Sequence, residues 1–240
     1  MLHKTKSIIL SKVKYNDKSY ILHTYTELFG RVTYSLSPSH KGSLHNALFF
    51  PISVLEMDVD HQATKEIQRI KDAKPYLMLN NVASDPVKNA IAYFIAEVLF
   101  RFLQENDPNE QLFDFIVESV RFLDESNESV ANFHLLFLVH LTFYLGFYPN
   151  WDNYVKGRSY LNRSTGNCET YMFQGMSYVD VRTTDLLYEI AHHSYLTMSS
   201  IEISRAERKV VTDSLITYLQ IHLNTSSSIK SLDVLKEIFD

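Results

Sequence analysis

Residues 5–37 have the sequence TKSIILSKVKYNDKSYILHTYTELFGRVTYSLS. Short runs of β-branched and aromatic residues are separated here by a polar Asn-Asp-Lys turn and by Gly30, a pattern typical of consecutive paired strands. Residues 31–37 alternate with a period of two, as expected for a strand with one buried face. The stretch therefore predicts strands at residues 5–15, 19–26 and 31–37.

Two further strands follow in the sequence. Leu48–Val59 predicts a fourth strand that Pro51 would bend or confine to an edge, and Ile67–Ala73 predicts a weaker fifth. Between the third and fourth runs lies a polar loop at residues 38–46, which is a candidate functional loop because of its length and composition. Five short strands that begin as a meander predict a small barrel of the OB type.

The pattern becomes helical after residue 81. Asp85-Pro86 is a helix start signal, and the apolar residues after it recur at three- and four-residue steps. Further helices are predicted at residues 112–123, 130–145, 184–195, from Ser204 onward, and at 232–239. Ser204 and Glu207 have the spacing of a capping box.

Residues 147–182 show no sustained period, which predicts an irregular lobe between helices. The predicted fold class is therefore α+β. A five-stranded OB-type barrel occupies residues 1–80, and a helical domain that carries the irregular lobe occupies residues 81–240.

Charge is distributed unevenly along the chain. Residues 1–50 contain seven Lys or Arg against two Asp or Glu, whereas residues 51–240 contain sixteen against twenty-six. A basic β module on an acidic helical body indicates a nucleic-acid contact on the first part and protein contacts on the second. The alternative is that these charges merely solvate a small sheet.

The sequence lacks the strong motifs of catalysis. It has no phosphate-binding glycine loop, dinucleotide fingerprint, H-E-x-x-H or G-x-S-x-G. Glu189 and His192 form a single E-x-x-H, too few ligands for a di-metal site, and Cys168 is the only cysteine. We therefore expect a protein that is not an enzyme, with no disulfide, no zinc and no cofactor.

Neither a signal segment nor a membrane span is predicted. His3, Lys4 and Lys6 interrupt the start of the chain, so we expect a cytoplasmic protein. The most apolar window, Phe133–Leu145, is shorter than the roughly 20 residues that a membrane span needs. A buried core helix accounts for it better.

The order of elements and several local strings resemble the RecO family of bacterial recombination mediators. The resemblance covers essentially the whole chain. It is carried by Ser7–Leu10, Asn16–Tyr20, Leu28–Val32, Ala92–Val98, Leu145–Pro149 and Lys230–Leu235.

This sequence departs from the family pattern in two places. Many members carry a four-cysteine zinc knuckle in the lobe, where this chain has Cys168 alone, so we expect Tyr154, Tyr160, Tyr171, Phe173 and Tyr178 to order the lobe instead. The loop after the third strand is also less basic than the family's usual version. It keeps only His40, Lys41 and His45.

The resemblance implies a mediator of DNA repair and recombination rather than an enzyme. Such a protein binds single- and double-stranded DNA, anneals complementary strands, and binds RecR and the C-terminal tail of single-stranded-DNA-binding protein. It thereby helps to load RecA on DNA that is covered by single-stranded-DNA-binding protein. The resemblance also implies a cytoplasmic, nucleoid-associated protein.

An OB barrel binds single strands through cations on the backbone and aromatic rings on the bases. Here the candidate DNA-binding residues are Lys4, Lys6, Lys12, Lys14, Lys18, Arg31, His40, Lys41, Tyr15, Tyr25 and Tyr34. Some of these tyrosines are expected to fill the barrel core instead. The candidates for contact with the partner's tail are Arg101, Arg121, Lys156, Arg158 and Arg163.

Two alternatives remain open at this point. One is an OB-fold adaptor that binds protein without significant DNA binding. The other is an enzyme that uses the lobe as a lid, which predicts a deep pocket with clustered titratable groups.

Overall fold

A computed structural model describes residues 2–17, 19–37, 48–103 and 108–239. Contacts within the chain divide it into two compact units. One unit contains residues 1–125 and 229–235, and the other contains residues 126–228 and 236–240. The predicted domain boundary at residue 80 stays a prediction.

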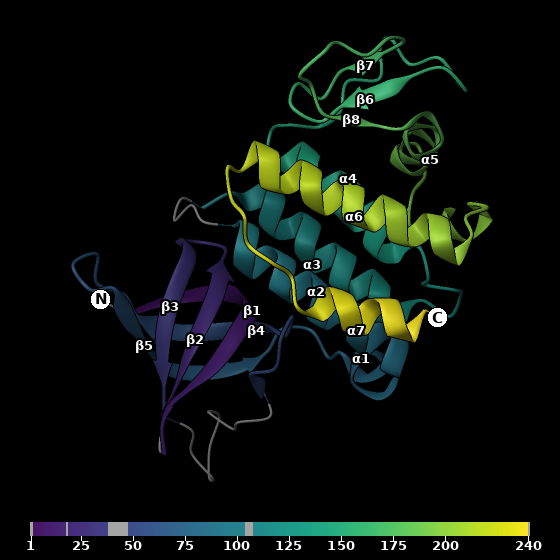
Figure 1. The fold of residues 1–240 in the computed structure, drawn as a ribbon. Coiled ribbons are helices and arrows are strands. Elements are labelled where there is room, and N and C mark those ends of the chain that lie inside the picture. The colour runs from purple at the N-terminus through teal and green to yellow at the C-terminus, as the bar shows by residue number, and fades with distance from the viewer. Residues whose placement is uncertain (1, 18, 38–47, 104–107, 240) are drawn as a thin grey trace. The chain divides into compact units, whose positions relative to one another are not determined.

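The first unit begins with a closed β-barrel (Figure 1). Its strands are β1 (Leu2–Asn16), β2 (Ser19–Thr26), β3 (Gly30–Leu36), β4 (Val54–Asp60) and β5 (Ile67–Pro75). They follow each other around the barrel in the order β1, β2, β3, β5, β4. β3 and β5 pair in parallel, and the other neighbours pair antiparallel. The predicted five-stranded barrel is confirmed.

β4 begins six residues later than predicted, because a tight turn precedes it. The Ser53 amide donates to the Phe50 carbonyl at 3.1 Å, and Pro51 and Ile52 occupy the two central positions of the turn. Ile52 has a φ of +67°, a conformation that costs a β-branched residue about 1–3 kcal/mol. A hydrogen bond of 2.6 Å from the Ile52 amide to the Ile9 carbonyl holds it in place.

The barrel is filled by side chains from alternate positions of its strands. The fully enclosed ones include Ile9, Leu22, Tyr34, Met57 and Val59. The Tyr34 side chain is 0% exposed, and its hydroxyl has no hydrogen-bond partner among the described residues. Burial raises the pKa of this phenol.

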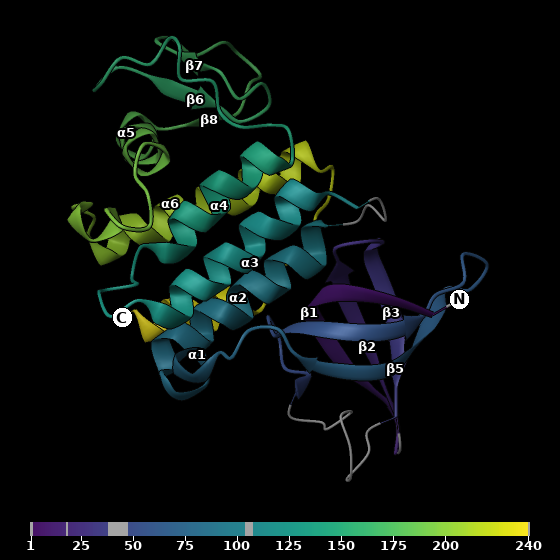
Figure 2. The same cartoon turned by 180° about the vertical axis from the view of Figure 1, so that it is seen from behind.

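Helices α1 (Asn80–Ser84), α2 (Pro86–Phe102) and α3 (Glu110–Glu125) complete most of the first unit (Figure 2). The Asp85 carboxylate caps α2, because it accepts from the backbone amides of Val87 at 2.8 Å and Lys88 at 3.1 Å. The predicted helix start is confirmed. α2 contacts β1, and Phe113 of α3 stacks against Tyr25 on the outer face of β2.

The second unit contains α4 (Phe133–Tyr144), α5 (Val181–Ala191), the short 3₁₀ helix Met198–Ser200 and α6 (Arg205–His222). α4 is buried on nearly every face and packs against α5 and α6, as its unbroken apolar sequence predicts. The last helix, α7 (Ser231–Ile238), contributes its first turns to the first unit and its end to the second.

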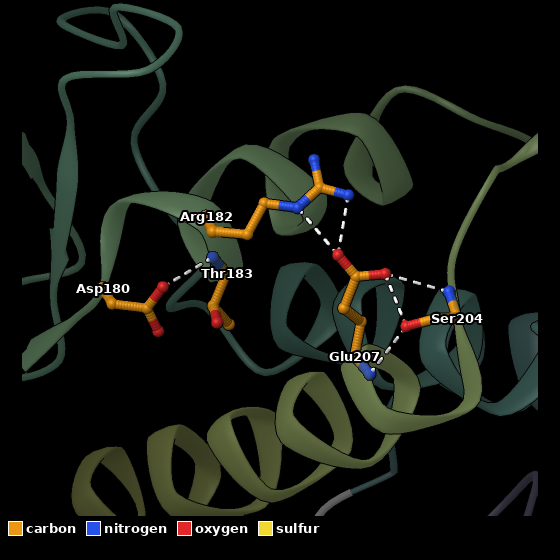
Figure 3. Close-up of polar contacts among 5 residues, drawn as sticks. All are labelled: Asp180, Arg182, Thr183, Ser204 and Glu207. Atoms are coloured by element: carbon orange, nitrogen blue, oxygen red, sulfur yellow. Dashed lines mark hydrogen bonds and ion pairs between the residues drawn. The ribbon is translucent and has the colours of Figure 1, made fainter.

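α6 starts at the predicted capping box (Figure 3). The Glu207 amide donates to the Ser204 hydroxyl, and the Ser204 amide donates to the Glu207 carboxylate at 2.9 Å. Arg182 of α5 donates to the same carboxylate at 2.8 Å. The hydrogen bonds from Ser204, together with Arg182, lower the pKa of Glu207 to about 2.

The lobe at residues 147–182 is mostly irregular, but it contains a small sheet of β6 (Tyr160–Asn162), β7 (Cys168–Glu169) and β8 (Tyr178–Val179). Strands of two or three residues are too short to leave a periodic signal in the sequence. The Tyr154 ring stacks on Tyr188 of α5 at 3.8 Å. Tyr160 and Tyr178 contact each other edge-on at 6.3 Å. Tyr171 and Phe173 also contact each other, at 4.8 Å, but they are 62% and 52% exposed and so contribute little buried surface to the lobe.

Within the described ranges, no helix is both long enough and apolar enough to cross a membrane.

Candidate nucleic-acid interface

The predicted DNA-binding residues do not form one surface. Lys18, His40 and Lys41 lie outside the described residues. The others are distributed over the outer face of the barrel, its core and the end of the β1–β2 hairpin.

Three lysines of β1 contact carboxylates. The Nζ atoms of Lys4, Lys6 and Lys14 lie 3.4, 2.8 and 3.1 Å from Glu56, Glu27 and Asp17, respectively. The hydrogen bond to Glu27 raises the pKa of Lys6. Lys74 of β5 also contacts Glu56, at 2.8 Å, so charges of both signs alternate over this face of the barrel. Exposed pairs of this kind are weak and exchange partners at little cost.

The three tyrosine candidates separate into one exposed and two buried side chains. Tyr15 is 72% exposed, close to the hairpin end. Tyr25 lies beneath α3 and Tyr34 lies inside the barrel, at 2% and 0% exposure. A base cannot stack on either buried ring in this conformation, so Tyr15 is the candidate that the fold leaves accessible.

Arg31 of β3 contacts α2 instead of open solvent. Its guanidinium donates to the Leu103 carbonyl, and its Cζ lies 4.9 Å from the centre of the Phe100 ring. Arg101 approaches the same ring at 5.4 Å, and His23 of β2 lies 5.0 Å from it. Burial, together with Arg31, lowers the pKa of His23. Phe100 is thus the centre of a cationic cluster.

Lys12 lies at a groove of about 500 Å³ between β1, the turn before β4, and α2. We call it the α2 groove and define it by Lys12, Phe50, Pro51, Tyr93, Phe100 and Arg101. The Lys12 ammonium lies 4.9 Å from the centre of the Tyr20 ring, and burial lowers its pKa. Lys12 is thus a sequence candidate that lines a groove together with aromatic side chains.

On the helical wall of the α2 groove, the sequence predictions named only Arg101, as a candidate for tail binding, and missed the other residues. Tyr93, Glu97, Phe100 and Arg101 recur at helical spacing and therefore face the same side of α2. Tyr93 is 47% exposed. The available signal was that Tyr93 and Phe100 lie off the apolar stripe of this helix, where large aromatic side chains are unexpected.

Glu97, the acidic residue of this wall, is engaged by α7. The amide and the hydroxyl of Ser231 donate to its Oε2 atom at 2.7 and 2.6 Å. These hydrogen bonds outweigh the effect of burial and hold the pKa of Glu97 below its ordinary value. The carboxylate acts as a cap for the start of α7.

A second groove, of about 680 Å³, lies on the barrel between the β2–β3 and β4–β5 connections. Its walls include Phe29, Arg31, His61 and Lys65. The Phe29 and His61 rings stack at 3.9 Å with an interplanar angle of 5°. The side chain of Gln68 fixes the β4–β5 connection through three hydrogen bonds to the backbone of residues 62 and 65.

The tail-binding candidates are in different environments. Arg101 lines the α2 groove and lies 3.8 Å from Glu97, while Arg121 lies 3.4 Å from Glu118 on its own helix. Lys156 and Arg158 are exposed on the lobe. The Arg163 guanidinium donates to the Tyr178 carbonyl, and burial lowers its pKa.

Cys168 is buried in β7, and burial raises the pKa of its thiol to about 11. In the described part of the chain, no group of three or more His, Cys, Asp or Glu side chains could hold a metal ion. His192 ends α5, and its Nδ1 lies 2.7 Å from the Tyr188 carbonyl. The absence of zinc stays a prediction.

Comparison with known proteins identifies the family. The model for the N-terminal part of recombination protein O matches residues 1–77, and the model for its C-terminal part matches residues 83–233. The chain belongs to the RecO family.

Members of the RecO family match the chain from end to end. The DNA repair protein RecO of Bacteroides fragilis is 36% identical over 244 residues, with 100% of both chains covered. That of Azobacteroides pseudotrichonymphae is 34% identical over 242 residues, again with 100% of both chains covered. That of Flavobacterium psychrophilum is 30% identical over 239 residues, with 98% of each chain covered. The chain is thus similar to DNA repair proteins of the RecO family over its whole length.

Proposed function

We propose that the protein is a recombination mediator in DNA repair that binds single- and double-stranded DNA, anneals complementary strands and helps to load RecA. One observation carries the proposal. A closed barrel formed by the basic end of the chain lies within a sequence that matches both RecO models. The relatives are named DNA repair proteins, and we propose the same role for this protein. We propose that it acts by binding, without catalysis, in the cytoplasm at the nucleoid.

The barrel supports DNA binding through its lysines. Ion pairs engage Lys4, Lys6 and Lys14, but side chains at a surface exchange a carboxylate for a phosphate readily. Released counterions then make the affinity fall steeply with salt. Tyr15 adds an exposed ring for base stacking near the same end of the hairpin.

The test is single-stranded DNA binding by the full-length protein, titrated with salt. Changing Lys12, Lys14 and Lys41 together to Glu should weaken binding strongly and reduce the salt slope by about 2, because each lost phosphate contact removes about 0.7. The matched control changes Lys156, Lys209 and Lys230 to Glu. A folded barrel variant that binds as tightly as the unchanged protein contradicts the proposal.

We propose RecR, the tail of single-stranded-DNA-binding protein and, indirectly, RecA as partners. The tail is acidic, and the helical part of the chain is acidic too, so recognition should depend on one local cation rather than on total charge. Tail-peptide binding should therefore fall in one single variant among Arg101, Arg121, Lys156, Arg158 and Arg163 changed to Gln. Equal small losses in all five variants would indicate diffuse attraction instead.

A second candidate function is an OB-fold adaptor that binds protein and not DNA. The burial of Tyr25 and Tyr34 and the pairing of the β1 lysines favour it. The two functions differ in one measurement. A mediator binds single-stranded DNA with an affinity that falls with salt, whereas an adaptor shows no DNA binding at low salt.

A further inference from the structure

We propose that the α2 groove is a single-strand contact in which a base stacks on Tyr93 while Lys12 and Arg101 bind the flanking phosphates. This inference rests on the proposed DNA binding and extends it from the barrel to α2. It assigns a role in DNA binding to Tyr93 and Arg101, two residues outside the barrel strands.

The walls of the groove supply the two kinds of side chain that bind single strands, namely cations for the phosphates and aromatic rings for the bases. Tyr93, Phe100 and Arg101 of α2 line it together with Lys12 of β1. Tyr93 is 47% exposed, so one of its surfaces is open to a planar ligand. Every base offers a π face, which makes this mode of binding tolerant of sequence.

The local charge favours phosphate despite the acidic total of the chain. Lys12 and Arg101 line the groove, and Arg31 meets Arg101 at the Phe100 ring. The one carboxylate of the groove, that of Glu97, accepts two hydrogen bonds from Ser231. Glu97 also lies 3.8 Å from Arg101, so one cation of the groove is partly paired. The groove nevertheless carries two cations, Lys12 and Arg101, against this single carboxylate.

The third wall is held rigidly. Phe50 and Pro51 belong to the turn whose residue Ile52 has a φ of +67°, and Ile52 itself is fully buried. Hydrogen bonds join this turn to β1, from the Ile52 amide to the Ile9 carbonyl and from the Ile9 amide to the Ser53 carbonyl at 2.9 Å. A strained residue that the surrounding structure over-determines is typical of a preorganised binding wall.

A strand of nucleic acid fits this arrangement better than the end of an acidic peptide does. Lys12 and Lys14 lie two residues apart on β1, so their side chains leave the strand about 6.6 Å apart on one face. Next to Lys12 and Arg101 of the groove, the β1–β2 hairpin adds Lys14 and the exposed ring of Tyr15. A nucleic-acid strand carries a phosphate at every nucleotide and can therefore contact several of these cations, whereas the carboxylate at a peptide end needs only one.

The experiment measures binding of a fluorescent oligothymidine to the full-length protein by anisotropy over a range of salt. Tyr93→Ala should weaken binding about 5- to 140-fold, since one stack contributes about 1–3 kcal/mol and each 1.4 kcal/mol is tenfold. Tyr93→Phe keeps the ring and should restore binding. Arg101→Gln should reduce the salt slope by about 0.7.

Two matched controls isolate the groove. Tyr171→Ala removes an exposed ring from the lobe, and Arg69→Gln removes a cation from β5 that lines neither groove. Both should bind like the unchanged protein. The thermal unfolding of every variant establishes that it is folded.

The outcomes separate this inference from the proposed function. If the unchanged protein binds no oligothymidine at low salt, the proposed function fails and the inference fails with it. If it binds but Tyr93→Ala and Arg101→Gln bind equally well, the inference alone is overturned. If the two variants lose an acidic tail peptide and keep DNA, the groove is a peptide site and the inference is again overturned.

Discussion

The barrel and the lobe both contain β-strands, but different forces hold them together. The barrel strands run for seven to fifteen residues, pair around a closed circle and enclose a continuous apolar core. The lobe strands have two or three residues. Their positions depend on hydrogen bonds from side chains, several of which lie on α5.

Asp185 of α5 shows how side-chain hydrogen bonds hold the lobe in place. Its carboxylate accepts from the Tyr154 hydroxyl at 2.8 Å and from the Gly157 amide at 3.1 Å. Its neighbour Thr184 accepts from the Leu161 amide at 3.0 Å, which fixes β6 to α5. The lobe therefore depends strongly on polar contacts between distant residues, beside a small apolar set that includes Leu161 and Val179, whereas burial of a continuous apolar core orders the barrel.

The largest expected effect compares one tyrosine from each region. Tyr34→Ala should lower the free energy of unfolding by about 3–5 kcal/mol, because it empties a fully enclosed site in the barrel. Tyr171→Ala should change it by less than about 0.5 kcal/mol, since that ring is mostly in solvent. Denaturant unfolding of the two variants measures both values. Similar losses would show that the lobe aromatics pack as the barrel core does.

The next effect concerns the polar order of the lobe. Asp185→Ala should cost about 1–3 kcal/mol, because it removes the acceptor of Tyr154 and Gly157. The loss should be local, so hydrogen exchange should accelerate at residues 154–161 while the barrel amides stay protected. Asp152→Ala, at an exposed position in the same lobe, is the matched control. Uniform acceleration across the chain would contradict a locally ordered lobe.

A smaller effect is expected at the start of α6, in the same unit as the lobe. Ser204→Ala should cost about 1 kcal/mol near neutral pH, the usual contribution of an N-cap. The pKa of Glu207 is about 2 in the folded protein and about 4.3 in an unfolded chain.

A lowered carboxylate pKa stabilises the fold above the unfolded value, and this stability is lost as pH falls through the folded value. The difference in the free energy of unfolding between the unchanged protein and Ser204→Ala should therefore become smaller as the pH falls from about 5 to about 2. Thermal unfolding at a series of pH values measures it. A constant difference would mean that the cap does not couple to Glu207.

The smallest effect returns to the barrel. Tyr34→Phe keeps the ring and removes a buried hydroxyl that has no partner among the described residues, so stability should stay unchanged or rise by up to about 1 kcal/mol. The same denaturant titration measures it. A clear loss would reveal that the hydroxyl makes a hydrogen bond within the barrel.

The sequence by itself determined the elements whose signals are local. Alternating side chains and turn residues located the strands from Ser19 to Leu36, and Asp85-Pro86 and Ser204-x-x-Glu207 located two helix starts. The order of elements and several local strings indicated the RecO family, which the two family models confirm. The strand and helix signals depend on residues only a few positions apart, and a single sequence is therefore enough to recognise them.

Only the tertiary structure decided which of the candidate residues share a surface. The pairing of β2 with β3 places Tyr25 and Tyr34 on opposite faces of the sheet, and the fold shows that α3 covers one and the barrel encloses the other. Likewise, Lys12, Tyr93 and Arg101 line the same groove although some eighty residues separate Lys12 from the other two in the chain. Contacts at such distances depend on barrel closure and helix packing, and no local pattern encodes them.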